Sequence, residues 1–356
     1  MIFASLRQPE ENVLTVYAQQ FNEKLLSIFK IMKLIIQIPC YDEEATLPVT
    51  LKELPKHVEG FESVEWLIID DGSTDQTVKV AESNGVDHVV SFTKHHGLAK
   101  GFMAGLDACL KLGADIIVNT DADNQYYSGD IPKLVKPILD KNADIVIGVR
   151  SIDSIDHFSP LKKLLQKMGS WAVRMVSKTD IPDTTSGFRA FSRDAAIRLN
   201  VFNEYTYTLE TLIQAGQKSM TVTSVPIRTN DNLRPSRLVK SIPSYIKNSI
   251  ITIIRIFVVY KPFRFFMFCG MTLFLFGISI GVRFLYHYFT VGGEGYIQSL
   301  ILSSILLGIG FQTVLVAFLA DLQSVNRRLM EDIQYRLKKR DYDFIQVDKM
   351  KVSLND

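Results

Sequence analysis

Two aspartates and a glutamine lie close together just after a short apolar segment of this chain. Asp121 and Asp123 are separated by one residue, and Gln125 follows two positions later. The segment before them, residues 115–119, is typical of a buried strand, and open α/β sheets bind ligands at the carboxyl ends of such strands. Two carboxylates at this spacing can share one hard divalent cation, which neutralises a diphosphate that the carboxylates alone repel. The spacing therefore predicts a metal and phosphate site, although an isolated pair of aspartates also occurs by chance in surface loops.

Two segments upstream have the same form, an apolar strand that ends in acidic residues. The first strand leads into Pro-Cys-Tyr-Asp-Glu at residues 39–43, and the second leads into Asp-Asp-Gly-Ser-Thr-Asp at residues 70–75. A glycine turn followed by serine, threonine and aspartate is typical of the start of a helix. The three acidic turns are therefore predicted to meet at one edge of a sheet.

In this order and at this spacing, the motifs Pro-x-Tyr-Asp-Glu, Asp-Asp-Gly-Ser-Thr-Asp and Asp-Ala-Asp-x-Gln resemble the nucleotide-sugar half of a family 2 glycosyltransferase. Within that family the chain is most similar to dolichyl-phosphate mannose and glucose synthases and their bacterial polyprenyl-phosphate relatives, from about residue 33 to about residue 237. The resemblance implies a GT-A fold, which is a Rossmann-like α/β domain. It also implies a UDP- or GDP-linked sugar as donor, a dolichyl or undecaprenyl phosphate as acceptor, and Mg²⁺ or Mn²⁺ as cofactor.

The resemblance assigns donor-side roles to individual residues. The positions that match nucleotide-sugar contacts are Pro39, Tyr41, Glu43, Ile69, Asp71, Asp121, Ala122, Asp123 and Arg150. Those that match metal ligands are Asp121, Asp123 and Gln125, and those that match catalytic positions are Asp123, Arg150 and Arg234. An arginine suits a leaving diphosphate because its planar guanidinium can donate two parallel hydrogen bonds. Helix capping is the alternative role for Asp71 and Asp75, and it fits Asp75 better than catalysis does.

The acceptor side that the resemblance implies is built from basic residues. Lys162, Arg189 and Arg237 match positions near the acceptor phosphate, and Arg189 ends a Ser-Gly-Phe-Arg turn at residues 186–189. The sequence departs from the family pattern at Lys162, where arginine is frequent, and at Arg234, where glycine is expected. A solvated linker near anionic lipid is therefore the alternative for the segment around Arg234.

The acceptor decides whether a general base is needed. A polyprenyl phosphate has a second pKa of about 6, so it is largely dianionic at neutral pH and already nucleophilic. A sugar hydroxyl would need a base, and Asp183 and Glu210 are the candidates. Two alternatives thus stay open: a transferase of the same fold that acts on a lipid or glycan hydroxyl, and a catalytically inactive membrane scaffold.

The elements that must position these residues alternate between strand and helix. Apolar segments near residues 33–39, 65–70, 88–92, 115–119 and 144–148 are separated by helical stretches. This alternation predicts a mostly parallel sheet with helices on both faces, and a more irregular region after residue 150.

Two long uncharged segments near the end of the chain predict membrane helices. Residues 265–282 contain no charged residue over 18 positions, and residues 296–320 contain none over 25. Each is long enough to cross a hydrocarbon core about 30 Å thick. Basic residues precede the first segment and follow the second, whereas the connector at residues 291–295 has none. The charge distribution predicts that the catalytic domain faces the cytoplasm.

Composition agrees with this division into parts. The chain has 356 residues, 47% of them hydrophobic, and a net charge of +2, and its mean hydropathy is +0.12. The expected organisation is an N-terminal extension (1–32), the GT-A domain (33–238), an interfacial amphipathic helix (239–262), a two-helix transmembrane region (263–322) and a cytoplasmic tail (323–356). Three isolated cysteines indicate neither disulfides nor a thiolate metal site. The basic residues near the membrane favour anionic lipid rather than nucleic acid as partner, and a homo-oligomer is possible.

Overall fold

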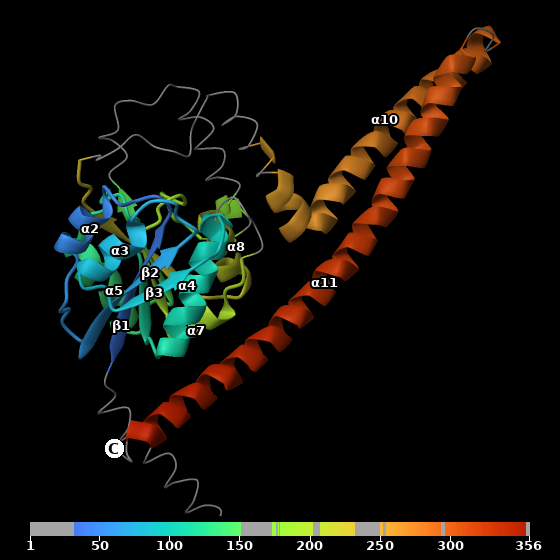
Figure 1. Ribbon diagram of the computed structural model, residues 1–356. Helices are drawn as coiled ribbons and strands as arrows, with labels where there is room; N and C mark the ends of the chain where they lie inside the picture. The colour runs from blue at the N-terminus through green and yellow to red at the C-terminus, as the bar shows by residue number, and fades with distance from the viewer. Residues whose placement is uncertain are drawn as a thin grey trace, which may run out of the picture.

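The computed structural model describes residues 32–150, 173–175, 177, 179–201, 207–231, 250–251, 254–292 and 296–353. An α/β domain is followed by two long helices that project from it as a hairpin, and the second of these helices runs back along the domain (Figure 1). The N-terminal extension lies outside the described residues up to residue 31, as do the predicted site residues Lys162, Arg234 and Arg237.

A sheet of seven strands forms the centre of the domain, in the order β3-β2-β1-β4-β6-β5-β7. Strands β1, β2, β3 and β4 are parallel to one another, β6 runs antiparallel to both of its neighbours, and β7 is parallel to β5. The bounds are β1 (Lys33–Cys40), β2 (Ser63–Asp70), β3 (His88–Ser91), β4 (Ile116–Asn119), β5 (Ile145–Arg150), β6 (Arg189–Ser192) and β7 (Val222–Ile227). The predicted mixed α/β fold is confirmed, and β6 and β7 are strands that the sequence pattern did not predict.

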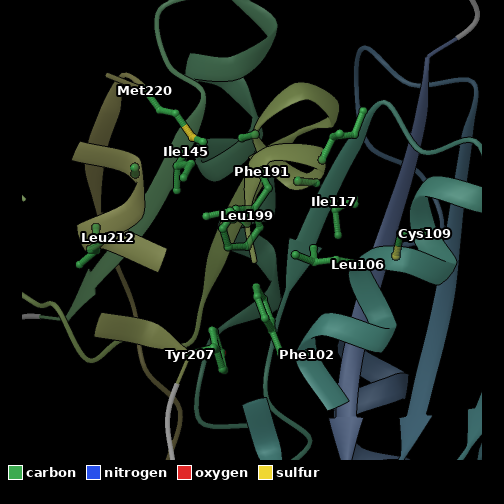
Figure 2. Close-up of a cluster of buried hydrophobic side chains, with 14 of the residues drawn as sticks. Phe102, Leu106, Cys109, Ile117, Ile145, Phe191, Leu199, Tyr207, Leu212 and Met220 are labelled. Atoms are coloured by element: carbon green, nitrogen blue, oxygen red, sulfur yellow. The ribbon is translucent and has the colours of Figure 1, made fainter. Parts of the chain in front are cut away.

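Helices cover both faces of the sheet because alternate residues of each buried strand point to opposite sides. Leu34, Ile36 and Ile38 of β1 pack with α2, α3 and α5, whereas Ile35 packs with α4, α7 and α8. Figure 2 shows part of the second cluster, with Phe102, Phe191 and Tyr207 among its side chains. The helices of the domain are α2 (Leu47–Glu53), α3 (Thr77–Ser83), α4 (Leu98–Leu112), the 3₁₀ helix η1 (Ser128–Asp130), α5 (Ile131–Leu139), α7 (Arg193–Arg198) and α8 (Thr208–Gln217).

The two long helices, α10 (Pro262–Val291) and α11 (Ile297–Ser353), pack against each other as a hairpin (Figure 1). Gly270 and Gly310 allow close approach, because a Cβ on either would lie about 3.0 Å from the carbonyl oxygen or main chain of the other helix. The Ser303 hydroxyl also donates to the Gly277 carbonyl oxygen at 2.7 Å. Each helix contains an apolar stretch long enough to cross a membrane, and the apolar side chains of both are largely exposed.

Helix α11 is longer than the predicted membrane span. It continues without a break through the segment expected to be a separate tail (323–356) as far as Ser353. This half of the helix contains neither glycine nor proline and carries i,i+4 ion pairs such as Asp332–Arg336, which favour a continuous helix. It docks on the domain, where the Tyr335 hydroxyl donates to Asp194 at 2.7 Å and Tyr342 donates to Asp107.

The predicted interfacial segment is described only in part. Residues 254–260 are helical, and residues 239–249 and 252–253 lie outside the description. In the described part, Ile256 is buried in the core, whereas Ile254 and Val259 are exposed. One face of this segment therefore packs on the domain and the other presents apolar side chains beside the start of α10.

Candidate active site

The acidic turns meet at one edge of the sheet. Strands β1, β2, β4 and β5 point the same way, so their carboxyl ends bring together Tyr41, Asp71, Asp121 and Arg150. This is the edge at which open α/β sheets bind ligands. The sequence-predicted donor-side residues thus come from turns that are far apart in the chain and adjacent in space.

A buried polar network supports the turn that carries the two aspartates. Asn119, the last residue of β4, accepts a hydrogen bond from Gln37 at 2.9 Å. Its amide nitrogen donates to the Gly187 carbonyl oxygen and to the Tyr207 hydroxyl, both at 2.9 Å. Gln37, Asn119 and Tyr207 are fully buried, and a satisfied buried network of this kind fixes a single arrangement. The network therefore fixes the 186–189 turn next to Asp121.

Asp121 lies directly against the main chain of Gly187. A Cβ at position 187 would come within 2.9 and 3.0 Å of the two carboxylate oxygens, so only glycine fits there without displacing Asp121. The Gly187 amide donates to the Tyr126 hydroxyl at 2.9 Å. Burial and then the negative charge of Asp121 raise the pKa of Tyr126, so this hydroxyl stays protonated.

The remaining residues of the acidic turn are also held in place. The Thr50 hydroxyl of α2 donates to the Ala122 carbonyl oxygen at 2.9 Å, and the main-chain amide of Gln125 donates to the Asp123 carboxylate at 3.2 Å. Asn124 is buried and has a positive φ of 57°, a conformation that asparagine tolerates better than most residues. Its side-chain oxygen has no hydrogen-bond partner among the described residues.

This donor set fits a hard divalent cation. Among the described residues, no group of three or more histidine, cysteine, aspartate or glutamate side chains surrounds a metal position. The turn offers instead two carboxylates, the amide oxygen of Gln125 and the unpartnered oxygen of Asn124. Mg²⁺ is typically bound by one or two carboxylates together with substrate phosphates rather than by an all-protein cage. The residues present therefore suit a cation that arrives with, or is completed by, a diphosphate.

Arg150 and Asp183 form a two-point ion pair. Arg150 donates through Nε at 2.8 Å and through Nη2 at 3.1 Å, and Nη2 also donates to the Thr185 hydroxyl at 3.2 Å. Burial alone would raise the pKa of Asp183, but the hydrogen bonds and charge of Arg150 outweigh it and lower that pKa. The Arg150 pKa is raised despite burial, through Asp183 and, more weakly, through the charge of Asp121. Asp183 is therefore a weak base.

Asp71 holds the loop that leads into α4. Its carboxylate accepts from the main-chain amides of His96 and Gly97 at 2.7 and 2.8 Å and lies 2.9 Å from Nδ1 of His95. The His95 ring is 4.2 Å from the half-exposed ring of Tyr41. Asp71 therefore fixes the loop before α4 rather than capping a helix, and it positions the Tyr41–His95 pair at the edge of the site.

The turns after β1 and β2 are fastened to each other. Asp75 accepts from the main-chain amide of Glu44, in the turn after β1, at 3.1 Å and from that of Thr77, the first residue of α3, at 2.9 Å. Glu43 is buried, with its carboxylate accepting from the Thr46 hydroxyl at 2.6 Å. Pro39 and Ile69 pair in register between the strands, and the Ile69 side chain packs in the core. Ile69 also pairs with Val90 of β3, so it lies inside the sheet, and its contact with a nucleotide stays a prediction.

The acceptor-side prediction for Arg189 is wrong in its detail. Arg189 is fully buried, and its guanidinium donates to the carbonyl oxygens of Ser186, Thr184 and Thr208 and to the Thr211 hydroxyl at 2.7 to 2.9 Å. A guanidinium bound in this way cannot reach a phosphate without breaking the turn. Its role is to fold the Ser-Gly-Phe-Arg turn that carries Gly187.

Glu210, a candidate base, is part of a different contact. It is buried on α8 and accepts from the Tyr260 hydroxyl at 2.9 Å and from Gln214 at 3.4 Å. The guanidinium of Arg327 on α11 lies over the Tyr260 ring at 4.7 Å. This link between the domain and the long hairpin was not predicted from the sequence, and the one available signal was an acid at a buried helical position, which requires a partner.

The comparisons with known proteins agree with this geometry. The model of the glycosyl transferase family 2 matches residues 35–199. The UDP-N-acetylglucosamine–dolichyl-phosphate N-acetylglucosaminyltransferase of Methanococcus voltae is 31% identical over 54% of this chain and 83% of its own length. The chain belongs to glycosyltransferase family 2. The undecaprenyl-phosphate mannosyltransferase of Micrococcus luteus, 29% identical over 55% of this chain and 83% of its own length, is a further similar member.

Solved structures share the fold of the domain. Glucosyl-3-phosphoglycerate synthase from Mycobacterium tuberculosis in complex with phosphoglyceric acid superimposes with a TM-score of 0.51 at 20% identity, over 62% of this chain and 80% of that one. The same enzyme in complex with Mn²⁺, UDP-glucose and phosphoglyceric acid gives a TM-score of 0.50 at 20% identity, over 65% of this chain and 82% of that one. The likeness supports the GT-A fold of this family 2 glycosyltransferase.

Proposed function

We propose that this chain is a membrane-anchored, inverting glycosyltransferase that transfers a hexose from a UDP- or GDP-linked sugar to a polyprenyl phosphate. The observation that carries the proposal is the state of the two candidate bases. Asp183 is bound to Arg150, which lowers its pKa, and Glu210 is bound to Tyr260. An acceptor that is already ionised needs neither of them. Relatives named for undecaprenyl and dolichyl phosphate support the same acceptor class.

On the donor side, Asp121 and Asp123 would hold Mg²⁺ or Mn²⁺ between the protein and the donor diphosphate, and the cation would neutralise charge on the leaving group. The charge of Asp121 contributes to the raised pKa of Arg150, so the two side chains lie near each other. Arg150 would therefore add a positive group beside the same diphosphate. The Tyr41–His95 pair would border the nucleotide.

The transfer itself is a single displacement. A phosphate oxygen of the acceptor forms a bond to the anomeric carbon of the sugar while the bond from that carbon to the nucleoside diphosphate breaks. The electron pair leaves with the diphosphate, and the attack from the opposite side inverts the anomeric configuration. The protein contributes position and charge, because two anions must be held together without repelling each other.

The membrane helices would bring the acceptor to the site. Basic residues that include Arg255, Lys261 and Arg264 precede the first span, and Arg327 and Arg328 follow the second. This distribution supports a domain on the cytoplasmic face. Lys162 and Arg237 remain our proposed contacts for the lipid phosphate, and Arg234 remains a proposed catalytic residue; all three lie outside the described residues.

The proposal is tested by incubating the purified full chain in nanodiscs with labelled nucleotide sugars and, as acceptors, polyprenyl phosphates or glycan hydroxyls. We expect labelled sugar on the lipid through an acid-labile phosphodiester. The rate should rise through about pH 6, the second pKa of the acceptor, and then level off. Asp183→Asn should lower the rate by loosening Arg150 without moving this pH profile. Transfer only to hydroxyl acceptors, or a pH profile that depends on Asp183, would contradict the proposal.

A further inference from the structure

An apolar stripe on α11 faces away from everything that the structure describes. Its members, separated by four or seven residues and therefore on one helical face, are Leu322, Leu329, Ile333, Leu337 and Phe344. Their exposed fractions run from 48% to 72%. We call this set the α11 stripe. Exposed apolar patches of this continuity mark interaction surfaces.

The opposite face of the same helix is already occupied. Glu331, Tyr335 and Tyr342 contact the domain through Lys218, Asp194 and Asp107, respectively. Glu331 and Tyr335 each lie two positions after a stripe residue, and two residues turn an α-helix by about 200°. The domain therefore covers one side of α11 and leaves the stripe on the other.

The bilayer does not reach most of the stripe. The uncharged part of α11 ends at Ala320, and the helix continues straight on for 24 residues to Phe344. At 1.5 Å per residue, Phe344 lies about 35 Å beyond the span, so only Leu322 is near the membrane surface.

We propose that the α11 stripe is the interface between two copies of this chain, packed as parallel helices in register. Both copies insert in the bilayer with the same orientation, so a two-fold axis along the membrane normal places the two α11 helices side by side and parallel. Confinement to the same membrane also raises the effective concentration of one copy for the other.

The charges beside the stripe complement this arrangement. Arg336 and Asp341 flank the stripe on opposite sides, with side chains 76% and 65% exposed. In a parallel helix pair, a residue on one flank lies beside the residue five positions later on the partner helix. Arg336 of each copy therefore faces Asp341 of the other copy, which gives two such pairs by symmetry. Arg340 lies within the stripe, and its guanidinium lies 3.8 Å from the Asp341 carboxylate. The negative charge of Asp341 reduces the repulsion between the Arg340 side chains of the two copies.

Cysteine crosslinking in membranes tests the register. The full chain would carry Ile333→Cys together with Cys269→Ser, while Cys40 and Cys109 stay buried. Oxidation should give a homodimer, because a disulfide forms only when the two Cα atoms approach within about 7 Å. The matched control is Arg328→Cys, an exposed position off the stripe, which should crosslink at least about tenfold less. Equal crosslinking at both positions would overturn the in-register interface.

A mass measurement tests the interface by a second route. In nanodiscs or mild detergent, the wild-type chain should have the mass of a dimer. Ile333→Glu with Leu337→Glu should give the monomer, and Arg328→Glu should not. The competing occupant is residues 1–31 of the same chain, and an intramolecular crosslink between Ile333→Cys and Phe21→Cys in a monomeric protein would overturn the proposal. The inference depends on membrane anchoring and not on the sugar chemistry, so loss of transfer by itself does not affect it.

Discussion

At the scale of single residues, the position of Asp121 depends on the absence of a side chain at Gly187. The carboxylate oxygens lie 2.9 and 3.0 Å from where a Cβ would stand, and the Gly187 main chain is itself fixed by Asn119 and Tyr126. A side chain at position 187 would therefore push Asp121 away rather than move the turn. The position of Asp121 thus depends on Gly187 and its partners as well as on the acidic turn itself.

Gly187→Ala should displace Asp121 and lower transfer at least about tenfold, which is the rate equivalent of about 1.4 kcal/mol. The fold should persist, because the change adds one methyl group at a turn. Gly101→Ala is the matched control: a Cβ there meets only Ile69 at 3.8 Å, in ordinary contact, and alanine favours a helix. Initial rates and melting temperatures of both variants check the prediction. A Gly187→Ala enzyme with the wild-type rate would show that Asp121 is free to shift.

The metal prediction concerns the same turn. Removal of divalent cations with a chelator, and separately Asp123→Ala, should each abolish transfer while the melting temperature of the protein stays within a few degrees. The reason is that two carboxylates facing a diphosphate repel it unless a cation lies between them. Addition of Mn²⁺ or Mg²⁺ should restore the chelated wild type and not the variant. Full transfer in excess chelator would remove the cation from the mechanism.

The sequence predicted the position of residues that lie in the turn directly after an apolar strand. Asp121, Asp123, Tyr41 and Asp71 were each predicted at the carboxyl ends of strands, where the structure places them; their contacts with a nucleotide sugar stay a prediction. The sequence was a poor guide to Arg189, because the partners of that guanidinium are main-chain carbonyl oxygens that only the folded turn brings together. A basic residue in a motif does not reveal whether its donors point into a site or into the protein.

At the scale of elements, the parallel strands were predictable from their apolar runs, whereas β6 and β7 were not. Strand β6 has four residues and begins with the buried Arg189, so it lacks an apolar pattern. Strand β7 contains a proline and is mostly half-buried at the edge of the sheet. Both depend on long-range pairing, which a local pattern does not encode.

The carboxyl end of β7 is fastened by an ion pair that predicts a pH effect on stability. Asp130 is fully buried and bonds to Arg228 and Lys133 at 2.7 and 2.8 Å. Burial opposes its charge, but the hydrogen bonds to Arg228 and Lys133 outweigh burial and lower the pKa to about 2. Because the folded pKa is below the unfolded one, the stabilisation is complete above about pH 4 and is lost as the pH falls toward 2.

Asp130→Asn should therefore lower the free energy of unfolding by about 1 kcal/mol at pH 5, a value reduced for screening because Arg228 is 61% exposed. The difference from wild type should shrink as the pH approaches 2. Asp140→Asn, which removes an exposed i,i+4 pair with Lys136, should change stability by less than about 0.5 kcal/mol. Denaturant titrations from pH 2 to pH 6 measure both. A difference that grows at low pH would contradict the assignment.

At the scale of the whole molecule, one contact joins the domain, the segment before the membrane and the long last helix. Tyr260 donates to Glu210 of α8, and Arg327 of α11 lies over the Tyr260 ring while donating to the Val259 carbonyl oxygen at 3.3 Å. Burial and then the charge of Glu210 raise the pKa of Tyr260, so the hydroxyl remains a donor. The catalytic domain is thus held against the hairpin beside the start of α10.

Tyr260→Phe should leave the buried Glu210 carboxylate with a lost hydrogen bond, at a cost of about 1 to 3 kcal/mol. For a domain of this size each kcal/mol lowers the melting temperature by about 2 to 4 °C. Tyr288→Phe, at an exposed position on α10, is the matched control and should not change the melting temperature. Thermal unfolding in nanodiscs distinguishes the two variants, and equal melting temperatures would show that this contact does not hold the parts together.

The continuity of α11 also has a consequence for how the chain is made. The catalytic domain leaves the ribosome first, and the half of α11 that covers α4 and α7 leaves last, after both long apolar segments have been synthesised. Until then the surface around Asp107 and Asp194 has no cover from Tyr342 and Tyr335. The domain therefore completes its packing only when the last helix has been synthesised. A chain that stops before Tyr335 keeps this surface open.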